Sequence, residues 1–84
     1  MPTAYVLINC DLGYENDIIK KIKRIPKVID VIHVSGVYDI IVRISSDDMD
    51  KLRETIKSNI KVIDNVRSTI TMIVTDGQGQ RHYK

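Results

Sequence analysis

A carboxylate stands between a glycine and an apolar segment in the middle of the sequence. The stretch VSGVYDIIVRI, residues 34–44, places Asp39 shortly after Gly36 and directly before residues typical of a buried strand. Gly36 can adopt a positive φ, which leaves nearby backbone N–H groups accessible to a carboxylate. Asp39 offers the opposite charge, which an α-ammonium requires. These residue types would suit an amino-acid site, but taken alone they favour a simpler structure, in which Gly36 serves the hairpin and Asp39 is exposed or caps local backbone groups.

Hydroxyl groups near the C-terminus are further candidates for ligand contacts. Ser68, Thr69 and Thr71 lie in an apolar segment with strand character and can donate hydrogen bonds from it. Other chemistry is weakly supported. His33 has no cysteine or histidine at metal-ligand spacing, so we predict no metal site and no cofactor. The sequence DGQGQ lacks the Lys-Ser/Thr and the following helix of a phosphate loop.

Composition bounds the class of protein. The chain has 84 residues, 43% apolar and 29% charged, which predicts one small globular domain. A formal charge of +2 does not by itself indicate a nucleic-acid partner. The single cysteine, Cys10, excludes an internal disulfide and fits a reducing compartment. Apolar segments are too short to span a membrane and no signal peptide is evident, so we expect a cytoplasmic protein.

The apolar periodicity predicts six elements. A strand over 4–8 precedes a helix that carries isoleucines at helical spacing and stops at Pro26. Two strands over 28–35 and 38–44 are separated only by Gly36 and Val37, which predicts a tight β-hairpin. A second helix begins near Asp48, and a last strand covers 66–74.

The order β-α-β-β-α-β, with right-handed crossovers, predicts an α+β, ferredoxin-like sandwich. We expect an antiparallel four-stranded sheet, with the first and third strands at its centre and two helices on one face. The domain is predicted over 1–74. Residues 75–84 have no apolar periodicity and are expected to form a flexible C-terminal tail.

The opposite sheet face is predicted to carry an apolar cluster. Alternation places Tyr5, Leu7 and Ile41 away from the helices, and Ile73 is expected beside them. A contiguous apolar patch on an open sheet face usually marks a partner surface. We therefore predict a homodimer interface there.

Several motifs together resemble the effector-binding domain of the Lrp/AsnC (feast/famine) transcription regulators. They are Ala4 to Gly13, Ile25-Pro26-Lys27-Val28, Val34 to Asp39, and Val66-Arg67-Ser68-Thr69. The most specific of these is Gly-x-Tyr-Asp at the hairpin, followed by a Ser-Thr pair in the last strand. The resemblance covers residues 4–74.

The resemblance implies a non-enzymatic, amino-acid-responsive regulatory or assembly module. It implies dimers that associate into rings, often octameric, with the effector held between dimers near the hairpin loop. Gly36, Val37, Tyr38 and Asp39 would then bind the effector. The family's helix-turn-helix has no counterpart before the first strand, so we expect no direct DNA binding and possible mixing with full-length regulators.

Alternative functions remain open at this point. An ACT-like module has the same element order and would bind its ligand near Asp11-Leu12-Gly13. A small dimeric ferredoxin-like enzyme would need an acid-base or nucleophile pair, which the sequence does not offer. A purely structural assembly domain would form rings without responding to a small molecule.

Overall fold

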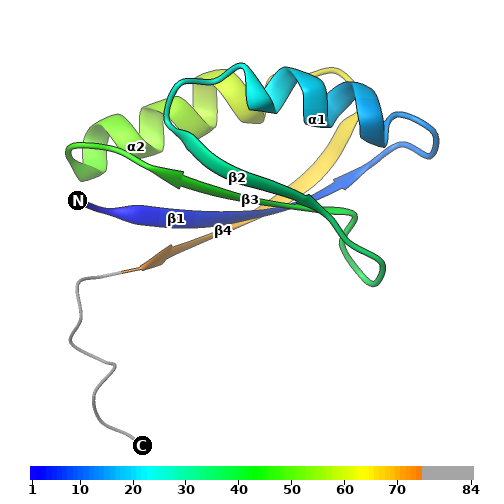
Figure 1. Ribbon diagram of the computed structural model, residues 1–84, viewed down its shortest axis with the longest axis horizontal. Coiled ribbons are helices and arrows are strands. Elements are labelled where there is room, and N and C mark those ends of the chain that lie inside the picture. The colour runs from blue at the N-terminus through cyan, green and yellow to red at the C-terminus, as the bar shows by residue number, and fades with distance from the viewer. Residues whose placement is uncertain (75–84) are drawn as a thin grey trace, which may run out of the picture.

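The computed structural model describes residues 1–74, which form a two-layer α/β sandwich (Figure 1). The strands are β1 (Thr3–Cys10), β2 (Val28–His33), β3 (Ile40–Ser45) and β4 (Val66–Val74). The helices are α1 (Glu15–Lys23) and α2 (Met49–Thr55), and a π-helical segment, η1 (Ile56–Ile60), continues α2. All three strand pairs are antiparallel, in the order β2-β3-β1-β4. The helices cover one face of the sheet, which confirms the predicted ferredoxin-like fold.

Strict alternation in the two central strands builds the core. Ala4, Val6 and Ile8 of β1 are fully buried, and the residues between them are only partly buried. The same pattern in β3 buries its partners Ile40, Val42 and Ile44. The helices complete the core with the fully or nearly fully buried side chains of Ile18, Ile22, Leu52, Ile56 and Ile60. The fully buried set of residues in each central strand therefore faces the helices.

Local signals explain where the helices begin and end. α1 has Glu15 and Asp17 in its first turn and lysines in its last, an order that complements the helix dipole. α2 starts at Asp48, whose side chain accepts a hydrogen bond of 2.8 Å from Lys51 N. η1 was not predicted. Its wider turn is closed by a bond of 3.1 Å from Lys61 N to Ile56 O.

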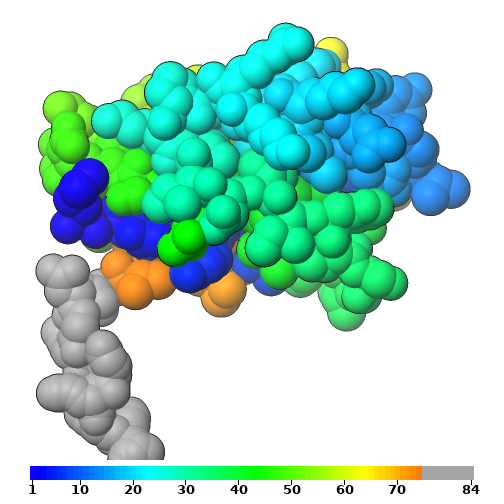
Figure 2. Space-filling model, viewed as in Figure 1, coloured from blue at the N-terminus to red at the C-terminus, as the bar shows by residue number. Residues whose placement is uncertain are grey.

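The connection between β2 and β3 corrects the predicted two-residue hairpin. β2 ends at His33 and β3 begins at Ile40, so the connection covers residues 34–39. The Val34 N–H donates to Asp39 O at 2.8 Å, which leaves four residues between the bonded pair. The loop is longer because the pairing ends at His33–Ile40. In the space-filling view it protrudes from the lower edge of the domain, at the end away from the N-terminus (Figure 2).

The face of the sheet opposite the helices, called the open face below, carries apolar side chains. Tyr5, Leu7 and Ile41 are half-buried there, as predicted from alternation. The expectation that Ile73 lies beside them is wrong. Ile73 pairs with the fully buried Ala4 and packs against the core. The β4 residues on the open face are instead Ile70, opposite Leu7, and Met72, opposite Tyr5, with exposed fractions of 48% and 50%.

Candidate functional site

Asp39 lies directly before β3 and is tied to the end of β1. Its backbone N–H donates to Ile8 O at 2.9 Å. Its side-chain Oδ2 accepts a hydrogen bond of 3.0 Å from the backbone N–H of Cys10. The side chain therefore does accept a backbone hydrogen bond, but from a residue 29 positions away, which differs from the local capping considered from the sequence. Oδ1 makes no hydrogen bond within residues 1–74, so one carboxylate oxygen remains available.

Two hollows have Asp39 in their lining. The loop hollow, of about 410 Å³, is lined by His33, Val34, Ser35, Gly36 and Asp39. The strand-end hollow, of about 320 Å³, is lined by Asn9, Cys10, Asp39, Arg67 and Ser68. Both volumes are at the lower end of the range for small-molecule sites, which suits a ligand of amino-acid size.

Arg67 also lines the strand-end hollow, and sequence analysis assigned no ligand-binding role to it. Its Nε lies 3.7 Å from Asp11 Oδ1, and its side chain is 70% exposed. So long and exposed an ion pair contributes little to stability, and it leaves the guanidinium free to bind another anion. The hollow thus combines the Asp39 carboxylate and the Arg67 guanidinium, the two charges that a zwitterion requires. The sequence does hold one signal for this residue, because Arg67 is a cation that directly precedes the predicted Ser68-Thr69 pair.

The negative charge near Asp39 is reflected in the pKa of Cys10. Burial of the thiol and the nearby Asp39 and Glu15 carboxylates raise this pKa from 9.0 to about 11. Asp11 contributes in the same direction. The end of β1 is therefore a site that favours positive charge. A thiol with such a pKa is fully protonated near neutral pH and is a poor nucleophile.

The predicted ligand residues do not all come together. Gly36 and Asp39 line the loop hollow, whereas Val37 projects from the loop with 84% of its surface exposed. Tyr38, the residue before Asp39, is half-buried. Gly36 has the expected positive φ, at 157°.

The three hydroxyl residues of β4 separate because neighbouring residues of a strand point to opposite faces. Ser68 pairs with Asn9 on the open face and reaches the strand-end hollow. Thr69 and Thr71 pair with the buried Ile8 and Val6, so they lie on the helix side of the sheet. Ser68 is thus the only one of the three that lines a hollow with Asp39 among those described here.

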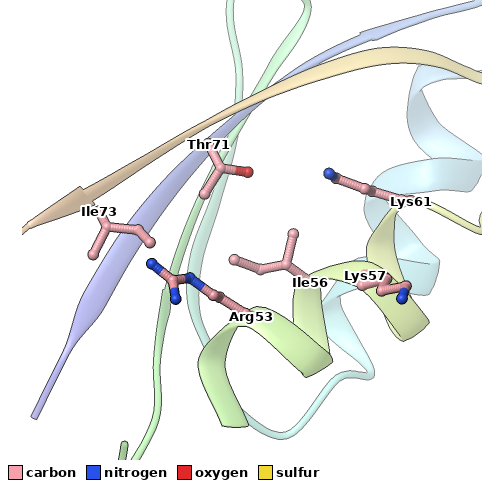
Figure 3. Close-up of a pocket in the computed structure, with 6 residues that line it drawn as sticks. All are labelled: Arg53, Ile56, Lys57, Lys61, Thr71 and Ile73. Carbon is pink, nitrogen blue, oxygen red and sulfur yellow. The ribbon is translucent and has the colours of Figure 1, made fainter. Parts of the chain in front are cut away.

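A third hollow, of about 500 Å³, lies between β4 and the helical segment α2–η1 (Figure 3). It is called the helix-side hollow below and is lined by Arg53, Ile56, Lys57, Lys61, Thr71 and Ile73. Residues 1–74 hold no cluster of three potential metal-binding side chains. None of their helices combines the length and the apolar character needed to cross a membrane.

Comparison with known proteins identifies the family. The family model described as "Lrp/AsnC ligand binding domain" matches residues 3–80. This chain therefore belongs to the Lrp/AsnC ligand-binding domain family. The match extends past Val74 into the segment predicted as a tail, and that predicted tail, 75–84, lies outside the described residues.

Individual relatives include both small proteins and larger ones. The structure is similar to FFRP-DM1, with 31% identity and a TM-score of 0.86, covering 89% of this chain and 100% of that one. It shares its fold with the Neisseria meningitidis regulator NMB0573, solved in complex with L-Met, at 13% identity and a TM-score of 0.80 over 96% of this chain and 53% of that one. A homocitrate synthase of Sulfurisphaera tokodaii is 32% identical over 72 residues. Those residues are 84% of this chain and only 15% of the synthase.

Proposed function

We propose that this chain is an amino-acid-responsive regulatory module that holds its effector in the strand-end hollow. The observation that carries the proposal is that Asp39 and Arg67 line the same hollow of amino-acid size. The α-ammonium lies against Asp39 Oδ1 and the α-carboxylate against the Arg67 guanidinium. Asn9 and Ser68 supply neutral hydrogen-bonding groups beside them.

This assignment moves the carboxylate contact from the position that the sequence suggested. Gly36 lines the loop hollow and not the strand-end hollow. A guanidinium forms stronger, charge-assisted hydrogen bonds to a carboxylate than neutral amides do. Arg67 is therefore the better partner, and Gly36 becomes part of the loop that holds Asp39 in place.

The proposal is for sensing rather than catalysis. The family model describes a ligand-binding domain, and a regulator of the same fold was solved with L-Met bound. A segment of homocitrate synthase is also similar to this chain, which is consistent with one sensing domain serving both regulators and a biosynthetic enzyme. The high pKa of Cys10 argues against that thiol as a nucleophile.

Assembly is part of the proposed function. The open face carries Tyr5, Leu7, Ile41, Ile70 and Met72, and we propose that it packs against the same face of a second copy. Arg43 lies among these residues, and its ion pair with Asp30 neutralises its charge and raises its pKa. A neutralised cation is compatible with a self-complementary interface. Association of dimers into a ring would bring the protruding β2–β3 loops to neighbouring subunits.

The test is a thermal-shift screen of the 84-residue chain against the common amino acids, with native mass measured in parallel. An effector at about 100 times its Kd adds roughly 2.7 kcal/mol to the free energy of unfolding. Asp39→Asn and Arg67→Gln should each abolish the response. Asp47→Asn, at the opposite end of β3, and Arg24→Gln, at the exposed end of α1, should retain it.

Each variant separates one contact from the alternatives. An unchanged response in Asp39→Asn would refute the site. A response that is lost in Asp39→Asn and retained in Arg67→Gln would move the carboxylate back to the loop hollow. A ligand that perturbs residues 11–15 rather than Asp39 would favour the ACT-like alternative. Stable rings with no response to any amino acid would leave a structural assembly domain.

A further inference from the structure

The helix-side hollow is lined by cations around an apolar floor, and the proposed effector site does not use it. Ile56, almost fully buried, forms the floor, and Ile73 of β4 forms part of one wall. Figure 3 shows the Arg53 guanidinium beside Ile73, and the Lys61 ammonium extending from the other side toward the Thr71 hydroxyl. Ile56 lies between the two cations, and Lys57 lies at the rim.

Two features of the chain build this arrangement. The pairing of Thr71 with Val6 and of Ile73 with Ala4 turns both β4 side chains toward the helices. The π-helical turn of η1, closed by the bond from Lys61 N to Ile56 O, sets Lys61 one residue farther along than an α-helical turn would. Such turns are frequent at functional sites.

The charge of the hollow is unbalanced. Its lining holds three cations and no carboxylate. The two ion pairs found within residues 1–74 are Arg43–Asp30 and Arg67–Asp11, and neither involves these cations. Arg53, Lys57 and Lys61 follow one another at intervals of four residues, a spacing at which like charges repel on a helix. The helix dipole accounts for cations near the C-terminal end of η1. Arg53 lies in the last turn of α2, but the helix continues through η1 to Ile60, so Arg53 is about two turns away from the end at which the dipole favours a cation.

We propose that the helix-side hollow binds an aliphatic dicarboxylate. One carboxylate pairs with the Arg53 guanidinium, whose planar fork matches its two oxygens. The aliphatic body lies over Ile56 and Ile73. The second carboxylate is bound by the Lys61 ammonium and the Thr71 hydroxyl. Phosphate lacks the carbon body that the two isoleucines would contact, and the volume of about 500 Å³ is within the range of small-molecule sites.

This site is independent of the proposed effector site. Thr71 and Ile73 face the helices, whereas Ser68 of the same strand lies on the open face with Asn9. The two sites therefore share neither lining residues nor a face of the sheet.

The experiment is an amide NMR titration of the whole chain with glutarate, with its monocarboxylate analogue valerate, and with inorganic phosphate, all at constant ionic strength. Glutarate should cause saturable shifts at Ile56, Thr71 and Ile73 and bind more tightly than valerate or phosphate. Arg53→Gln and Lys61→Gln should each lower the affinity for glutarate about fivefold, which corresponds to the loss of one partly screened ion pair. Lys23→Gln, on the exposed side of α1, should leave its affinity unchanged.

Three results would overturn the proposal. Shifts that do not saturate would show only general screening by the added anion. Equal affinities for glutarate and valerate, or for glutarate and phosphate, would remove the dicarboxylate as the ligand. No glutarate binding, combined with a change of native mass in Arg53→Gln or Lys61→Gln, would make this surface a contact between protein chains. Because both side chains are exposed, the variants should fold, and their amide spectra check this directly.

Discussion

Replacing Asp39 by alanine is expected to destabilise the fold in the absence of any ligand. Asp39 Oδ2 accepts a hydrogen bond of 3.0 Å from the Cys10 N–H. Cys10 is only 8% exposed. The alanine variant strands this N–H at the buried end of β1, and a buried donor without an acceptor costs about 1–3 kcal/mol. In a domain this small, a loss of about 2 kcal/mol lowers the Tm by roughly 10 °C.

Asp39→Asn separates the hydrogen bond from the charge. The asparagine keeps one acceptor oxygen for the Cys10 N–H and loses only the charge assistance, which is worth about 1 kcal/mol. Part of that loss is offset by relief of repulsion between like charges. Asp11 and Glu15 act on Cys10 together with Asp39, so removing the Asp39 charge lowers the density of negative charge at this end of β1. The expected order of stability is therefore native, then Asp39→Asn, then Asp39→Ala.

Urea denaturation near neutral pH measures this order. All variants are compared at one protein concentration, because the proposed subunit association would make the apparent stability depend on concentration. Asp47→Ala, an exposed aspartate at the other end of β3, is the matched control. The reasoning fails if Asp39→Ala stays within about 0.5 kcal/mol of this control, the usual range for surface substitutions. It also fails if asparagine is as damaging as alanine, since the charge would then matter rather than the acceptor.

Three further predictions concern assembly, pH and an unpaired hydroxyl. Leu7→Lys or Ile41→Lys should dissociate the proposed dimer, because an unpaired charge is expensive to bury. Leu12→Lys, in an exposed loop, should leave the dimer intact. Light scattering that finds a 9.6 kDa monomer for the native chain would contradict the interface. Because the pKa of Cys10 rises from 9.0 to about 11 on folding, the folded state holds its proton more tightly, so stability should fall by about 2 kcal/mol as pH rises from 9 to 11. Denaturation of Cys10→Ala across that range should lack this component. Ser46→Ala should raise the free energy of unfolding by about 1 kcal/mol, because within residues 1–74 the fully buried Ser46 hydroxyl has no hydrogen-bond partner. A lower urea midpoint for this variant would show that the hydroxyl does have a hydrogen-bond partner.

Local patterns in the sequence were sufficient for the order of elements and for most of the core. Strict alternation in β1 and β3 divides each strand into two sets. The prediction that Tyr5, Leu7 and Ile41 face away from the helices therefore places the other set against them, and that set is buried. Acidic residues marked where the two helices begin, and Pro26 marked where α1 ends. These signals can be read from the sequence because each acts on backbone groups only a few residues away. The charge and glycine pattern around Asp39 also identified the loop that borders the candidate site.

Pairing between distant segments decided the remainder. Both faces of β4 carry apolar residues, so its own alternation does not tell which face meets the helices, and only the register with β1 turns Ile73 inward and Met72 outward. The Cys10–Asp39 bond joins residues 29 positions apart, and Arg67 and Asp39 line the same hollow only because both lie beside the end of β1. No single segment of the sequence specifies which distant residues come together in this way. Such arrangements exist because the sheet brings separate strands together, and the free energy that fixes their register comes from the whole buried face.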